Sequence, residues 1–153
     1  MSEGIKLVAK NRHAYHEYSV IEKLEAGIAL LGTEVKSIRV NSAISLKESY
    51  VDFNKGEAWL VGARISPYAQ ANINNHAPER PRRLLLRKRQ ILWLTRKVEE
   101  KGLTVAPLAV YFKRGKVKLE IGLCRGKHLY DKRETIKQRE SDREVQRAMK
   151  RRM

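Results

Sequence analysis

Apolar and polar side chains alternate along much of the chain, with the period of two that is typical of β-strands. The longest alternation covers residues 18–30 and predicts a half-buried strand that Gly27 could bend or bulge. Only Glu22 interrupts the expected apolar face. Its members are Tyr18, Val20, Leu24, Ala26, Ile28 and Leu30. Later alternations predict hairpins over residues 51–65 and 105–123.

Two segments have helical spacing instead. Residues 32–39 predict a short helix that Thr33 could cap, and residues 84–101 predict the main helix, with Gly102 as a natural stop. By the same periodicity Trp93 occupies a core-like position, so we interpret it as a packing residue. The return strand of the first hairpin has the same kind of positions at Trp59, Val61, Ala63 and Ile65.

The order strand, helix, hairpin, helix, hairpin is the layout of an OB fold. We therefore predict a mainly β protein, a small antiparallel OB-like barrel with two or more helices. Residues 1–14 should form a basic arm, residues 15–130 the barrel and residues 131–153 a basic tail. The tail has nine Lys or Arg, five acids and few apolar residues. It should be disordered when free and become helical on a partner.

The high positive charge of the chain indicates a polyanionic partner. The chain has 33 Lys and Arg against 17 Asp and Glu, a formal net charge of +16, and a nucleic acid would relieve the resulting self-repulsion. Cys124 is the single cysteine, and neither a signal segment nor a membrane-spanning run of about 20 apolar residues is evident. A soluble, cytoplasmic protein is expected.

Three clusters could contact RNA. Residues 80–89 contain six cations and no acid, residues 125–133 combine Lys and Arg with His128 and Tyr130, and residues 11–16 form a polar segment near the N-terminus. Each could also be an ordinary solvated surface. The net charge and the basic tail favour RNA contact.

Catalytic and cofactor motifs are not evident in the sequence. Glu34 is a lone carboxylate in a basic, apolar neighbourhood, and such a group is more often a cap or ion-pair partner than an acid catalyst. His13 and His16 have metal-ligand spacing, but no further ligand adjoins them. We therefore expect neither enzymatic activity nor a cofactor or metal.

Several segments together resemble the SmpB family from about residue 6 to the end. The segments are Asn11-Arg12 with Tyr18, residues 27–39 (GIALLGTEVKSIR), Gly56-Glu57-Ala58, residues 83–86, Gly126-Lys127, Asp131-Lys132-Arg133 and Ile136-Lys137. The resemblance implies a bacterial OB-like barrel that binds the tRNA-like domain of transfer-messenger RNA (tmRNA, or SsrA RNA). With elongation factor Tu and GTP, such a protein brings this RNA to stalled ribosomes, where the nascent peptide is tagged.

The resemblance also assigns residues. Asn11 could read a base edge, and Glu34 could accept hydrogen bonds from exposed bases. Together with charge clustering, the expected RNA-binding set is Asn11, Arg12, Glu34, Lys36, Arg39, Arg80, Arg82, Arg83, Lys88, Lys127 and His128. The expected set for the decoding centre and messenger channel of the small ribosomal subunit is Tyr130, Asp131, Lys132, Arg133, Lys137, Arg139, Arg143, Arg147, Met149 and Lys150, with Arg151 and Arg152 beside them.

Two positions depart from the family pattern. Tyr130 stands where many members have His, and Ala148 stands where a larger aliphatic residue is common. Neither changes the expected role, that of a monomeric adaptor. The alternatives are a generic RNA-binding OB protein of the ribosome or of initiation, a nuclease, and a peripheral membrane protein. The tail lacks the apolar face that the last of these needs.

Overall fold

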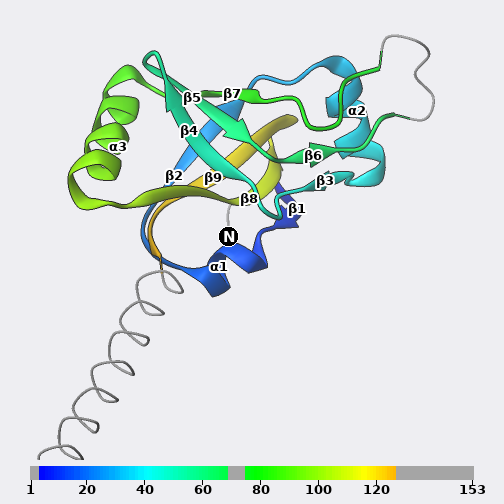
Figure 1. Ribbon diagram of the computed structural model, residues 1–153. Coiled ribbons are helices and arrows are strands. Elements are labelled where there is room, and N and C mark those ends of the chain that lie inside the picture. The colour runs from blue at the N-terminus through cyan, green and yellow to red at the C-terminus, as the bar shows by residue number, and fades with distance from the viewer. Residues whose placement is uncertain (1–3, 69–74, 127–153) are drawn as a thin grey trace, which may run out of the picture.

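The computed structural model describes residues 4–68 and 75–126 (Figure 1). Seven strands form one antiparallel sheet in the order β1-β8-β9-β2-β7-β5-β4, and a small pair, β3 and β6, lies apart from it. The seven are β1 (Ile5–Lys10), β2 (Tyr18–Ile28), β4 (Tyr50–Asn54), β5 (Glu57–Val61), β7 (Arg82–Leu85), β8 (Thr104–Lys113) and β9 (Lys116–Gly126). The pair is β3 (Ile44–Ser45) and β6 (Arg64–Ile65), and the helices are α1 (Arg12–Glu17), α2 (Gly32–Asn41) and α3 (Lys88–Lys101).

The sheet curls until its edge strand β4 packs against β8. In the described ranges no hydrogen-bonded ladder joins these two strands, so the curl does not close into a barrel. The prediction of a mainly β, antiparallel fold with at least two helices is confirmed. No helix among the described residues is long and apolar enough to cross a membrane.

The main core fills the inside of the curl. Leu119 and Ile121 of β9 face Leu60 of β5, and α3 adds Leu94, each of them fully buried. Burying one such side chain contributes roughly 1.5–3 kcal/mol. The amphipathic helix α3 therefore covers part of the core with one face and leaves the other in solvent, ending at Gly102 in the left-handed conformation (φ +63°), as the sequence predicts.

Bulges divide the core in two. The register of β2 against β9 shifts between Val20 and Glu22, which leaves Ile21 unpaired. Because one extra residue reverses the faces of a strand, Tyr18 and Val20 point away from the main core. They pack under α1 with a second cluster, whose buried members are Ala14, Ala106, Leu108 and Cys124. The prediction that residues 18–30 share one apolar face is therefore wrong, and the bulge is not at Gly27.

Cys124 packs in this second cluster as a small apolar group. Its thiol contacts the carbonyl oxygen of Gly122 at 3.2 Å, and burial raises the pKa of the thiol to about 11. A thiol with so high a pKa stays protonated at neutral pH and is a poor nucleophile.

Gly62 similarly changes the face of the first hairpin. Its φ is +84°, and a Cβ there would lie 2.9 Å from the carbonyl oxygen of Glu48. The chain turns at this point, so Ala58 and Leu60 are buried before it and Ala63 and Ile65 after it. Trp59 stands opposite Asp52 and Arg83 on the outer face, half-buried. The core-like position predicted for Trp59 is wrong, whereas Trp93 does pack against the main core.

Two further segments differ from expectation. Residues 82–85 form β7 rather than the start of the main helix, since Arg82 and Leu84 point inward and pair with β5. Residues 5–10, placed by the sequence analysis in a loose arm, form β1 and pair with β8. Ile5 and Leu7 remain exposed at the sheet edge, so β1 is held by its pairing with β8 rather than by a buried apolar face.

Gly122 tests the packing of the second cluster. A Cβ added there would lie 2.6 Å from Cδ1 of the buried Leu108. Gly122→Ala should therefore destabilise the fold by about 1–3 kcal/mol, the usual cost of overpacking, as measured by urea denaturation. Gly32→Ala is the matched control, because nothing lies within 4 Å of the added atom. Equal stability of the two variants would contradict this packing, whereas Leu108→Val should reduce the cost of Gly122→Ala.

Candidate nucleic-acid interface

The start of helix α2 is capped by the side chain of its own third residue, Glu34. The carboxylate of Glu34 accepts from the backbone N–H of Leu31 at 2.8 Å, which satisfies one of the free donors at the helix start. Thr33 was the predicted cap, but it lies within the first turn and contacts His76 instead. Glu34, and not Thr33, therefore caps the N-terminus of α2.

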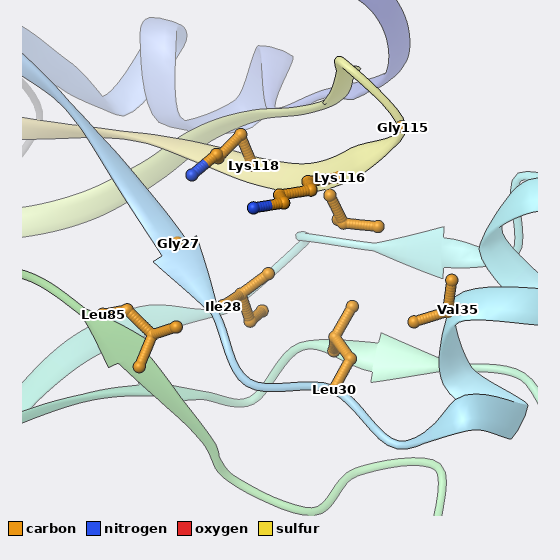
Figure 2. A pocket seen from close by; sticks show the side chains of 9 residues that line it. Gly27, Ile28, Leu30, Val35, Leu85, Gly115, Lys116 and Lys118 are labelled. Atoms are coloured by element: carbon orange, nitrogen blue, oxygen red, sulfur yellow. The ribbon is translucent and has the colours of Figure 1, made fainter.

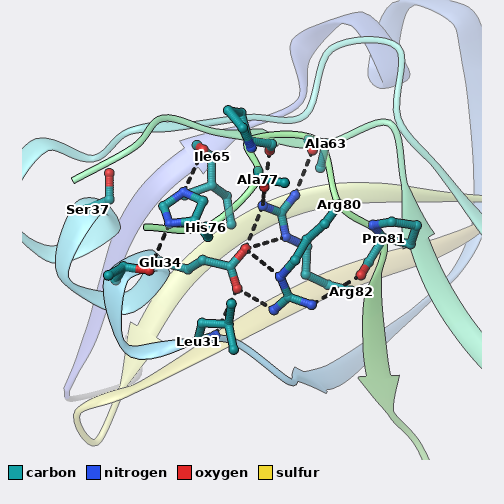
Figure 3. A network of polar contacts seen from close by, with 12 residues as sticks. Leu31, Glu34, Ser37, Ala63, Ile65, His76, Ala77, Arg80, Pro81 and Arg82 are labelled. Atoms are coloured by element: carbon teal, nitrogen blue, oxygen red, sulfur yellow. Dashed lines mark hydrogen bonds and ion pairs between the residues drawn. The ribbon is translucent and has the colours of Figure 1, made fainter. Parts of the chain in front are cut away.

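Glu34 also lies in a buried ion-pair network, drawn in Figure 3. Arg82 donates from Nε to Oε2 of its carboxylate at 2.7 Å, the Nη2 atom lies 2.6 Å from the same oxygen, and both side chains are fully buried. Arg80 donates to both carboxylate oxygens and is about three-tenths exposed. The remaining donors of Arg82 reach backbone carbonyls of Ala63 (2.8 Å) and Pro78 (3.0 Å).

The network keeps Glu34 ionised. Burial raises the pKa of its carboxyl, but the hydrogen bonds from Arg80, Leu31 and Arg82 outweigh burial and hold that pKa below its usual value. Burial likewise lowers the pKa of Arg82 against the opposing effect of Glu34, although a guanidinium remains charged at any ordinary pH. Two full charges are thus paired inside the protein.

His76 extends this network on the other side of α2. Its ring is buried and lies 2.8 Å from the carbonyl oxygen of Ile65 through Nε2 and 2.9 Å from Thr33 Oγ1 through Nδ1. Because a carbonyl only accepts, Nε2 carries the proton, and in the neutral ring Nδ1 accepts from the hydroxyl of Thr33. The first turn of α2 is therefore tied to β6 as well as to β7.

The fixed helix displays its cations outward. Lys36 and Arg39 are exposed, and the guanidinium of Arg39 lies 5.5 Å from the ring centroid of Phe112 and donates to the carbonyl of Gly115 at 3.5 Å. This contact joins α2 to the β8–β9 hairpin. The two elements together form the α2 face, which we define by Lys36, Arg39 and the hollow described next.

A hollow of about 290 Å³ lies on the α2 face (Figure 2). Ile28 of β2, Leu30 of the segment that follows it and Val35 of α2 line one side, and Lys116 and Lys118 of β9 line the other. An apolar recess bordered by two ammonium groups suits an unstacked base and its phosphates. Sequence reasoning missed both lysines, although their alternation with Val117 already indicated that they point away from the core.

Asn11 lies elsewhere and is buried. Its Nδ2 donates to the carbonyl of Pro107 at 2.8 Å and to that of Leu46 at 3.3 Å, and its Oδ1 accepts from the N–H of Ala14, which starts α1. Arg12, the next residue, is exposed. Figure 1 shows α1 well separated from α2 on the sheet, so the structure does not gather these residues into one patch.

The other predicted residues divide by location. Arg83 is exposed on β7, 3.8 Å from Glu57, and Lys88 is exposed at the start of α3. Strand β9 ends at Gly126, which pairs with Tyr18 beside the end of α1. The residues outside the described ranges are Lys127, His128, Tyr130, Asp131, Lys132, Arg133, Lys137, Arg139, Arg143, Arg147, Met149 and Lys150.

The curled antiparallel sheet places the protein in the β class, and outward cations beside an apolar recess are the features expected of a small RNA-binding protein of that class. A family model described as SmpB protein matches residues 8–151. The chain belongs to the SmpB family, whose members are RNA-binding proteins and not enzymes.

Individual relatives agree. The SsrA-binding protein of Syntrophobacter fumaroxidans is 54% identical over 151 residues, which cover 99% of this chain and 93% of the relative. The SsrA-binding protein of Chlamydia trachomatis is 50% identical over 148 residues, 97% of each chain. A solved structure described as "tmRNA-SmpB: a journey to the center of the bacterial ribosome" is similar with a TM-score of 0.64 and 46% identity, covering 78% of this chain and 83% of that one.

Glu34→Gln tests the buried ion pair. The substitution leaves the guanidinium of Arg82 buried without a counter-charge, and should lower the free energy of unfolding by about 3–5 kcal/mol in urea denaturation. Glu57→Gln is the matched control, because the 3.8 Å pair that it removes is solvent-exposed and contributes only about 0–1 kcal/mol. Equal effects of the two substitutions would show that the network does not stabilise the fold.

Proposed function

We propose that this protein binds the tRNA-like domain of tmRNA and acts as the adaptor of trans-translation. Membership of the SmpB family over nearly the whole chain is the observation that carries this proposal, since the similar relatives are SsrA-binding proteins. The curled sheet takes the place of the OB-like barrel expected for the family, with residues 131–153 as a tail beyond it.

The α2 face supplies a surface suited to the RNA. Lys36 and Arg39 provide cations for phosphates, and the recess beside Lys116 and Lys118 accepts an unstacked base. Glu34 contributes indirectly, since both of its oxygens are engaged by Arg80, Arg82 and the N–H of Leu31. It orients α2 and positions the partly exposed Arg80.

A second group lies near α1 and the end of β9. Arg12 is exposed there, and the chain continues from Gly126 into Lys127 and His128, which we assign to RNA as well. The tail, from Tyr130 to Lys150, enters the decoding centre and the empty messenger channel of a stalled ribosome and becomes helical there. Elongation factor Tu with GTP joins through the RNA, and the protein works as a monomer in the cytoplasm.

Binding to RNA should be selective. A tRNA-like domain transcript should bind tightly at physiological salt and resist competition by an elongator tRNA. Lys36→Gln with Lys116→Gln removes two cations of the α2 face, and should lower the slope of log Kd against log salt by about 1.8. Lys47→Gln with Lys101→Gln, an equal charge change elsewhere, should leave binding nearly unchanged. Equal binding to both RNAs would favour a generic RNA-binding protein instead.

Deleting residues 131–153 separates delivery from binding. The shortened chain should keep its affinity for the tRNA-like domain but lose peptide tagging on ribosomes stalled without a stop codon. A tail of the same composition in scrambled order is the matched control, and it should also fail to support tagging. Tagging by the deletion variant, or by the scrambled variant, would contradict a specific role of the tail.

A further inference from the structure

The outward face of α3 and its N-cap carry three arginines, and one carboxylate, Glu99, borders the same surface. Arg87, Arg89 and Arg96 are exposed, and none forms an ion pair with any residue of the ranges 4–68 and 75–126. Leu92 lies among them with 52% of its side chain exposed. One exposed leucine is ordinary on a protein surface, but Leu92 adjoins the partly exposed Trp93, so the two form an apolar strip between the guanidinium groups.

Four arginines elsewhere in the described ranges are engaged within the protein. Arg82 and Arg80 bind Glu34, Arg83 lies beside Glu57, and Arg39 lies over Phe112. These contacts satisfy or restrain their guanidinium groups. Within the described residues Arg89 and Arg96 of α3 form no side-chain ion pair, and a planar guanidinium suits phosphate oxygens.

Two hollows flank Leu92. One, of about 460 Å³, is bordered by Arg87, Arg89, Arg96 and the partly exposed Trp93. The other, of about 620 Å³, lies between α3 and the β4–β5 hairpin and includes Phe53 and Lys88. Each is large enough for a nucleotide, and each combines an aromatic side chain with cations.

We propose that this α3 surface, defined by Arg87, Arg89, Leu92, Trp93 and Arg96 with Phe53 across the helix, is a second RNA-binding site, for a single-stranded segment. A base in the first hollow contacts Leu92 and reaches the ring of Trp93 by displacing the ammonium of Lys97, which lies 5.8 Å from the ring centroid. A neighbouring base reaches Phe53 in the second hollow. The phosphates between them meet Arg89 and Arg96. Aromatic contacts with bases and cationic contacts with the backbone are the common mode of single-strand recognition.

The position of α3 makes the site independent of the α2 face. Figure 1 shows α2 and α3 at opposite ends of the curled sheet. An RNA bound on one helix therefore leaves the other helix free. The site goes beyond the proposed function, because it gives the protein contact with a second RNA segment while the first stays bound.

Trp93 provides a direct signal. The chain has two tryptophans, so in a Trp59→Phe background the fluorescence reports on Trp93 alone. An unstructured ten-nucleotide RNA added to this full-length protein should quench that fluorescence in a saturable way. The opposite variant, Trp93→Phe with Trp59 retained, should show no quenching. Quenching confined to the second protein, or found in neither, overturns the proposal.

Paired charge variants test the arginines. Arg89→Gln with Arg96→Gln should lower the slope of log Kd against log salt by about 1.4, the value for two phosphate contacts on a single strand. Lys6→Gln with Lys47→Gln, exposed cations remote from α3, should leave the titration unchanged. Equal losses in both double variants would mean that net charge alone attracts RNA, and would overturn a defined site.

Two competitors distinguish the remaining outcomes. A saturating tRNA-like domain transcript should not displace the ten-nucleotide RNA from Trp93, and displacement would overturn the independence of the two sites. A polyglutamate peptide that quenches Trp93 as strongly as RNA does would assign the surface to an acidic protein. Failure of the proposed function would appear differently, as loss of selectivity for the tRNA-like domain with the Trp93 titration intact.

Discussion

The ion pair between Glu34 and Arg82 sets the geometry on which the candidate interface depends. It joins the first turn of α2 to β7 and to the carbonyls of residues 63 and 78, in a place that water does not reach. Removing two charges from water costs several kcal/mol per ion, and the pair's own attraction largely offsets that cost rather than exceeding it. The ion pair therefore adds little net stability, and its main effect is to fix the orientation of α2. A fork of guanidinium donors accepts one placement of the carboxylate, and so fixes which side of α2 faces outward.

This constraint explains why residues of one basic run differ so much. Arg80, Arg82 and Arg83 look alike in the sequence, yet they are partly exposed, fully buried and exposed respectively. In a strand, alternate side chains point to opposite faces, and Glu34 offers the inward one a partner. Sequence reasoning placed all three on the RNA because charge was visible and the buried acceptor was not. Sequence reasoning likewise placed Glu34 on the RNA, although both of its carboxylate oxygens accept hydrogen bonds from within the protein.

The fold was more accessible to sequence reasoning than the site. Periodicity alone predicted the hairpin of β8 and β9, the helix that ends at Gly102 and the antiparallel class, because each depends on local pattern. It failed where one residue reverses a strand's faces, at Ile21 and at Gly62, since the cause is a tertiary contact. β7 was assigned to a helix because its pairing with β5 and β2 is non-local. Such errors assign buried side chains to the surface and surface side chains to the core. They affect the predicted site more than the predicted fold, because the interface is made of surface side chains.

Charge is distributed unevenly over the described surface, and this bears on function. At one end of the sheet Glu34 and the Phe112 ring hold arginines in place, so that lysines form much of the contact surface around the recess. At the other end α3 presents arginines that form no ion pair within the described residues, beside exposed Leu92 and partly exposed Trp93. Lysine contacts phosphate as a flexible point charge, whereas arginine adds planar hydrogen bonding and stacking. Two ends with different chemistry suit the two proposed RNA partners, a folded one on α2 and an unpaired one on α3, and this is the division that the proposed adaptor role would use.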